Sequence, residues 1–150
     1  MEGANTKVPA SAGWLGGFGA APFVGLAGAM SLLTGAPRMF VAHALVAYGA
    51  TILSFLGGVH WGLAIGSHGG QDNGKMGARL ALSVIPPLAG WGALLVPERP
   101  GLFVLALAIA AMLWVDVRAT RVGLAPPWYP RLRIPLTCVV VATLMFGAIV

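Results

Sequence analysis

Five long apolar segments, separated by short polar or proline-rich stretches, dominate the pattern of the chain. They cover residues 13–33, 39–66, 76–96, 101–119 and 134–150. Each is about 17 residues or longer, which is enough for an α-helix to cross the hydrocarbon core of a bilayer. The pattern therefore predicts an all-α integral membrane protein, a compact bundle of five transmembrane helices. It divides the chain into a short polar tail, residues 1–11, and a single transmembrane domain, residues 12–150.

Composition supports the membrane class. The chain is 58% hydrophobic and only 9% charged, whereas soluble domains carry about 25% charged residues. So few charges cannot cover the surface of a soluble domain of 150 residues. The excess apolar surface must therefore face lipid.

The distribution of basic residues predicts an orientation. Lys and Arg flank the apolar segments in short loops, where they meet lipid headgroups, so nucleic acid is not expected as a partner. Nine basic residues split seven to two between the two sides of the membrane. The side of the N-terminus holds Lys7, Lys75, Arg79, Arg118, Arg121, Arg131 and Arg133, and the other side holds Arg38 and Arg99. We therefore expect a cytoplasmic N-terminus and an extracytoplasmic C-terminus in a bacterial cytoplasmic (inner) membrane.

Two apolar segments carry small residues at a spacing of four, which places them on one side of a helix. In membranes, such stripes let helices approach closely. The stripe in residues 39–66 consists of Ala50, Ser54, Gly58, Gly62 and Gly66. The stripe in residues 13–33 includes Gly17, Ala21 and Gly25. We expect both stripes to pack helices of the bundle together.

Several polar residues are predicted to lie at one depth, in the cytoplasmic half of the membrane. They are His60, Trp61, Asp116, Arg131 and Arg133. An ionisable group in lipid is costly when unpaired, so it is by default a candidate functional site. Two interpretations remain open here. The residues form a polar intramembrane site, or an Asp–Arg pair simply holds the fourth segment against the fifth.

His60 has several possible roles. It could bind haem, relay a proton, hydrogen-bond a quinone carbonyl or donate to a free backbone carbonyl. It has no partner at metal-ligand spacing, so no metal site is predicted and any cofactor stays undetermined. Trp128 and Tyr129 are expected to anchor the protein at the membrane interface. The sequence contains no Walker loop, nucleophile elbow, zinc motif or paired carboxylates, so no catalytic residue is assigned and an enzyme is not expected.

Three stretches resemble a family of small membrane proteins of unknown function that includes eukaryotic transmembrane protein 69. They are FLGGVHWGLA at 55–64 (after Tyr48 and Gly49), SVIPPLAGW at 83–91 and PWYPRLRIPLT at 127–137. The resemblance implies a compact multi-helix bundle found in bacterial and mitochondrial membranes, without an established activity. It also implies that six matched positions are candidates for an important site without a known reaction, namely His60, Trp61, Trp128, Tyr129, Arg131 and Arg133.

Two functions are consistent with these observations. The first is a non-catalytic accessory or assembly component of a larger membrane complex, for example an energy-transducing one, in contact with lipids and a protein partner. The second is a protein that handles a quinone, haem or proton in a pocket around His60 and Asp116. Copurification with a larger complex favours the first, and a bound chromophore or lipid-like density beside His60 favours the second.

Overall fold

The computed structural model describes residues 7–66 and 73–150, with side chains in the second range from residue 76 onward. Within these residues the chain forms five α-helices, and the predicted all-α bundle is confirmed. The helices are α1 (Ala10–Leu32), α2 (Gly35–Gly66), α3 (Asn73–Leu94), α4 (Glu98–Arg121) and α5 (Tyr129–Ile149). Most of the predicted polar tail and the stretch 67–72 lie outside the described residues.

The helices begin earlier than the apolar pattern predicts. The largest difference is in α5, which starts at Tyr129 instead of residue 134. The proline-rich stretch misled the prediction because Pro130 occupies the first turn of α5. A proline is tolerated there, since the first-turn N–H groups have no partner inside the helix. The linker before α5 is correspondingly shorter than expected.

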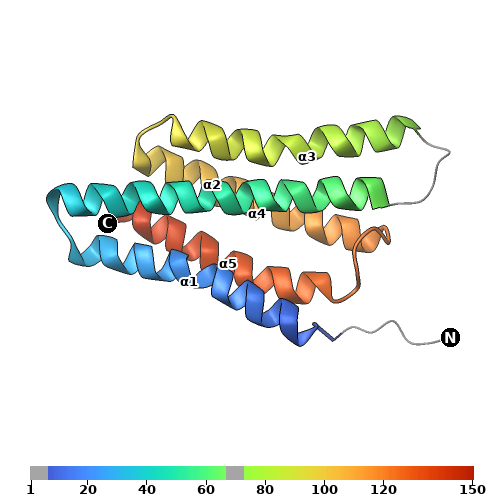
Figure 1. The fold of residues 1–150 in the computed structure, drawn as a ribbon, viewed down its shortest axis with the longest axis horizontal. Helices are drawn as coiled ribbons and strands as arrows, with labels where there is room; N and C mark the ends of the chain where they lie inside the picture. The colour runs from blue at the N-terminus through green and yellow to red at the C-terminus, as the bar shows by residue number, and fades with distance from the viewer. Residues whose placement is uncertain (1–6, 67–72) are drawn as a thin grey trace.

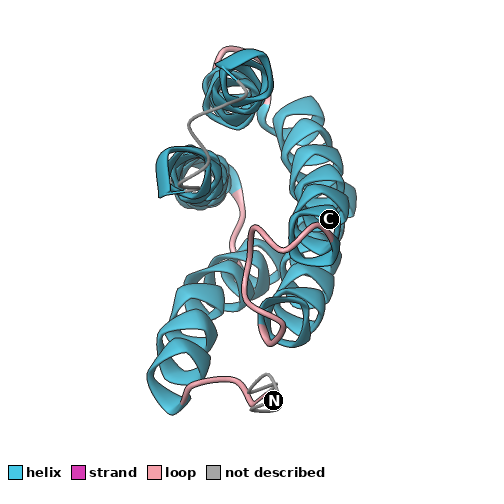
Figure 2. Cartoon of the chain, turned by 90° about the vertical axis from the view of Figure 1, so that its right-hand side faces the viewer, coloured by secondary structure: helices cyan, strands magenta, loops and turns pink. Residues whose placement is uncertain are grey.

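Helices α1, α2, α4 and α5 form a ring, and α3 lies outside it. Helix α1 packs against α2 and α5, α4 packs against the same two helices, and α3 packs against α2 and α4. Successive helices run in opposite directions, and the two ends of the chain lie at opposite ends of the bundle (Figure 1). Seen from the end near the N-terminus, all described secondary structure is helical, joined by loops (Figure 2).

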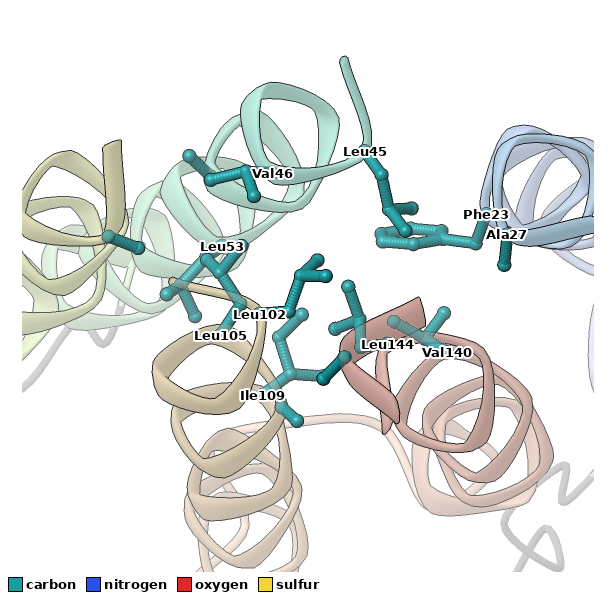
Figure 3. Close-up of a cluster of buried hydrophobic side chains, with 14 of the residues drawn as sticks. Phe23, Ala27, Leu45, Val46, Leu53, Leu102, Leu105, Ile109, Val140 and Leu144 are labelled. Carbon is teal, nitrogen blue, oxygen red and sulfur yellow. The ribbon is translucent and has the colours of Figure 1, made fainter. Parts of the chain in front are cut away.

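The core lies where the four helices of the ring meet. Large apolar side chains from all four point into it (Figure 3). The largest fully buried ones are Phe23, Leu45, Leu53, Leu102, Leu105, Ile109 and Leu144. In a bilayer the surrounding lipid is as apolar as these side chains, so close packing and not water exclusion holds them together.

Within the described ranges, four helices are long and apolar enough to cross a membrane, namely α1, α2, α4 and α5. Helix α3, although 22 residues long, is not among them. It nevertheless runs alongside α2 in the opposite direction (Figure 1). The bundle exposes many large apolar side chains, such as Leu15, Leu32 and Leu107. This surface is suited to contact with lipid chains.

The predicted packing stripes are wrong as contacts within this chain, with the exception of Ala50. A Cβ placed on Gly90 of α3 would lie 3.2 Å from the Ala50 Cα. By contrast, Ser54 and Ala21 are exposed. The stripe glycines without any atom within 4 Å of an added Cβ are Gly17, Gly25, Gly58, Gly62 and Gly66.

The physical reason lies in the helical repeat. At about 100° per residue, positions four apart advance by about 40° around the helix at each step. A stripe that starts against α3 at Ala50 therefore winds onto the outer surface by Gly58. The contact is made by Gly57 instead, where an added Cβ would lie 2.6 Å from the Ser83 carbonyl oxygen.

Candidate functional site

Three of the five predicted polar residues come together at the end of the bundle where α4 ends and α5 begins, namely His60, Asp116 and Arg133. Asp116, on α4, is 1% exposed. Its Oδ1 accepts a hydrogen bond from His60 Nε2 of α2 at 2.7 Å. Its Oδ2 accepts one from Arg133 Nε of α5 at 2.6 Å. One side chain therefore joins three helices, and two of them, α2 and α5, are not major packing neighbours.

Further contacts complete the surroundings of Asp116. The phenol of Tyr129, in the first turn of α5, lies near the Asp116 carboxylate. Thr120 Oγ1 donates to the Asp116 backbone carbonyl at 3.1 Å. We call His60, Asp116, Tyr129 and Arg133 the Asp116 network. Arg133 supplies the positive charge that makes a buried carboxylate tolerable, and His60 adds a second hydrogen bond.

The geometry also locates a proton. An ionised carboxylate can accept hydrogen bonds but cannot donate them, and Asp116 is paired as a carboxylate with the Arg133 guanidinium. In the bond between His60 and Asp116, the hydrogen is therefore on His60 Nε2. His60 is therefore a donor to Asp116. Of the roles considered for it, donation to a free backbone carbonyl through Nε2 does not occur. The ion pair between Asp116 and Arg133 holds α4 against α5, as the structural interpretation predicts.

Two of the five predicted site residues lie outside the network. Trp61 follows His60 in α2 but points outward and is 45% exposed. Arg131 is also exposed. Trp61 is one position from His60, so its side chain is turned by about 100° around α2. Arg131 is two positions from Arg133, so its side chain is turned by about 200° around α5.

Sequence analysis missed the part played by Tyr129 in the network. Its place beside Trp128 in a basic linker is typical of an interface anchor, and the two rings do pack edge-to-face at 6.0 Å. The signal that could have revealed the second role is the spacing of four between Tyr129 and Arg133. On a helix this spacing puts both side chains on one face.

Buried hydrogen-bonding capacity remains unused beside the network. Arg133 Nη2 and Thr137 Oγ1 are both buried and have no hydrogen-bond partner. They lie one turn apart on α5. An unpaired buried polar group costs about 1–3 kcal/mol. The arrangement is therefore chemically suited to a small hydrogen-bond acceptor, such as a water molecule, between these two side chains. In the described ranges no three His, Cys, Asp or Glu side chains gather to hold a metal ion.

Comparison with known proteins places the chain in a family. The model of a family described as "Protein of unknown function (DUF3429)" matches residues 8–149. The chain belongs to this family. It is 39% identical over 141 residues to Transmembrane protein 69 of Xenopus tropicalis, covering 91% of this chain and 53% of that protein. It is 31% identical over 99 residues to the Mus musculus protein of the same name, covering 66% of this chain and 40% of that protein.

Membership in DUF3429 confirms the resemblance inferred from the three sequence stretches. Together with the long apolar helices, it makes the chain a multi-pass membrane protein. The chain spans only about half of the length of its frog relative. No solved structure matches it significantly. In this member of the family, two of the three stretches supply three of the four network residues, since His60 lies in 55–64 and both Tyr129 and Arg133 lie in 127–137, whereas Asp116 lies in none of them.

Proposed function

We propose that this DUF3429 protein is a non-catalytic accessory or assembly component of a larger complex in the bacterial inner membrane, for example an energy-transducing one. The observation that carries the proposal is the outer face of α2. There Gly58 and Gly62 are exposed, and a Cβ on either would meet no atom within 4 Å. Large exposed side chains flank them, among them Phe55 and Ile65. We call these four residues the outer α2 face.

This face has the composition of a helix–helix contact. Small residues at a spacing of four allow two helix backbones to approach closely, and large neighbours fill the space on either side. Among the described residues, no other helix comes within 4 Å of a Cβ placed on either glycine. On α1, Gly17 and Gly25 are exposed in the same way. We infer that a transmembrane helix of a partner protein packs against the outer α2 face.

The Asp116 network supports a structural role. Both carboxylate oxygens already accept hydrogen bonds from the chain itself. Asp116 therefore has little free capacity to act on a substrate. Its position between α2, α4 and α5 instead fixes the relative placement of three helices, which keeps the outer α2 face rigid for a partner.

Replacing Gly62 with leucine is expected to abolish stoichiometric copurification of the partner in mild detergent, while the thermal stability of the purified protein stays unchanged. The added side chain separates the partner helix from α2, but it meets nothing inside the chain. Tagged protein from native membranes, analysed by quantitative mass spectrometry, measures the first quantity. Unfolding in detergent measures the second.

The matched control is Gly77→Leu on α3, another exposed glycine whose added Cβ would contact nothing within 4 Å. It should retain the partner. Recovery of the parent protein without any stoichiometric partner contradicts the proposed function. So does a Gly62→Leu variant that retains the partner in full.

We further propose that all five helices span the membrane with the N-terminus in the cytoplasm. The antiparallel order of the helices supports this orientation, because it collects most of the described basic residues at the end nearest the N-terminus (Figure 1). Among the seven residues assigned to that side, the side chain of Lys75 is not described. A reporter fused after Val150 is expected to be active only outside the cytoplasm. Cytoplasmic activity of this reporter would show that the number of spans or their direction is wrong.

A further inference from the structure

A cleft of about 320 Å³ opens at the end of the bundle opposite the Asp116 network. It lies between the start of α2 and the start of α4, and α1 and α5 contribute to its wall. Its lining includes Met30, Arg38, Met39, Glu98, Arg99 and Gly147. Ligand sites in proteins have volumes of about 300–1,000 Å³, so this cleft can hold a small polar group.

The charges of this cleft favour an anion. Arg38 lies near the start of α2 and Arg99 near the start of α4. Neither forms an ion pair with an acidic side chain among the described residues. The one acidic lining residue, Glu98, offsets only one of the two arginines. The first turns of α2 and α4 add the N-terminal ends of two helix dipoles, which also attract anions.

The remaining walls are apolar. Met30 and Leu102 are buried residues of the core that reach the floor of the cleft. Gly147 packs closely against the core here, because a Cβ on it would lie 3.0 Å from Leu45 Cδ2. Outside the cleft, Leu32 and Leu95 are exposed at the same end of the bundle. A pocket with two arginines and otherwise mostly apolar walls thus adjoins a surface suited to acyl chains.

We propose that this cleft binds the phosphate headgroup of an anionic phospholipid. The two guanidinium groups would hold the phosphate through charge-assisted hydrogen bonds, for which arginine geometry is well suited. The acyl chains would run along the exposed apolar side chains of the bundle. The proposed partner-binding role does not depend on this lipid site, which lies at the opposite end from Gly62.

The test uses the purified protein in an uncharged detergent, with phosphatidylglycerol, phosphatidylcholine and inorganic phosphate as separate probes. Native mass spectrometry measures binding, and the thermal unfolding midpoint measures stabilisation. We expect phosphatidylglycerol to bind and to raise the midpoint. Arg38→Gln and Arg99→Gln should each weaken its binding about tenfold, because each removes one charge-assisted contact. Glu98→Gln should strengthen binding, because it removes the repelling carboxylate.

Arg121→Gln is the matched control, since Arg121 is an exposed arginine at the other end of α4. It should bind phosphatidylglycerol like the parent protein. Equal binding of phosphatidylcholine and phosphatidylglycerol overturns the proposal. So does unchanged phosphatidylglycerol binding in the Arg38→Gln/Arg99→Gln double variant. Inorganic phosphate that binds as tightly as phosphatidylglycerol would identify a site for free phosphate and overturn the assignment to a lipid.

Discussion

Replacing Asp116 with leucine is expected to lower the free energy of unfolding by about 3–5 kcal/mol, the range observed when one partner of a buried ion pair is removed. The cost arises because Arg133 keeps its charge but loses its counter-charge, and water cannot replace that partner well at a side chain that is only 10% exposed. His60 loses its hydrogen-bond acceptor at the same time. Equilibrium unfolding in detergent micelles provides the measurement. The control is Glu98→Gln, because Glu98 is an acidic residue that forms no ion pair among the described residues.

Two further variants separate the charge from the hydrogen bonds. The double variant Asp116→Leu/Arg133→Leu should recover much of the lost stability, because no uncompensated charge remains. His60→Leu should cost only about 1 kcal/mol, since it removes a hydrogen bond from a carboxylate that keeps its arginine. Equal losses for Asp116→Leu and His60→Leu would contradict the assignment of Arg133 as the charge partner that decides stability.

Gly57→Ala is expected to destabilise the bundle by about 1–3 kcal/mol, the usual cost of overpacking a core. The added Cβ would lie 2.6 Å from the Ser83 carbonyl oxygen and 2.7 Å from Pro87 Cδ. The first is backbone and the second belongs to a rigid ring, so neither can move without shifting α3 away from α2. Thermal unfolding of the purified protein in detergent measures the effect.

Gly58→Ala is the matched control for this prediction, because it makes the same change one position along the same helix. An added Cβ at Gly58 meets nothing within 4 Å, and alanine favours a helix more than glycine does. This variant should be as stable as the parent or slightly more so. If Gly58→Ala destabilised the protein as much as Gly57→Ala, the placement of α3 against α2 would be incorrect.

Much of the candidate site could be predicted because depth in a membrane follows from position along a helix. His60 and Asp116 lie toward the C-terminal ends of α2 and α4, which run in the same direction, and Arg133 lies near the start of α5, which runs in the opposite direction. These facts alone bring the three residues to one level. Whether they also face one another depends on the rotation of each helix about its axis. Because this rotation is not fixed by the sequence, the predicted site includes Trp61 and Arg131, which lie outside the network, and it omits Tyr129, which belongs to it.

The sequence by itself determined the membrane class, the helices and the depth of the polar residues, because apolar length and charge composition act on each segment independently. The tertiary structure alone decided which face of each helix is buried. In a soluble protein, alternation of polar and apolar positions marks the inner face. Helix α2 is apolar on all sides, since lipid and protein interior are equally apolar neighbours. Only packing against α3 could therefore show that Gly57 is buried in the bundle and Gly58 lies on its surface.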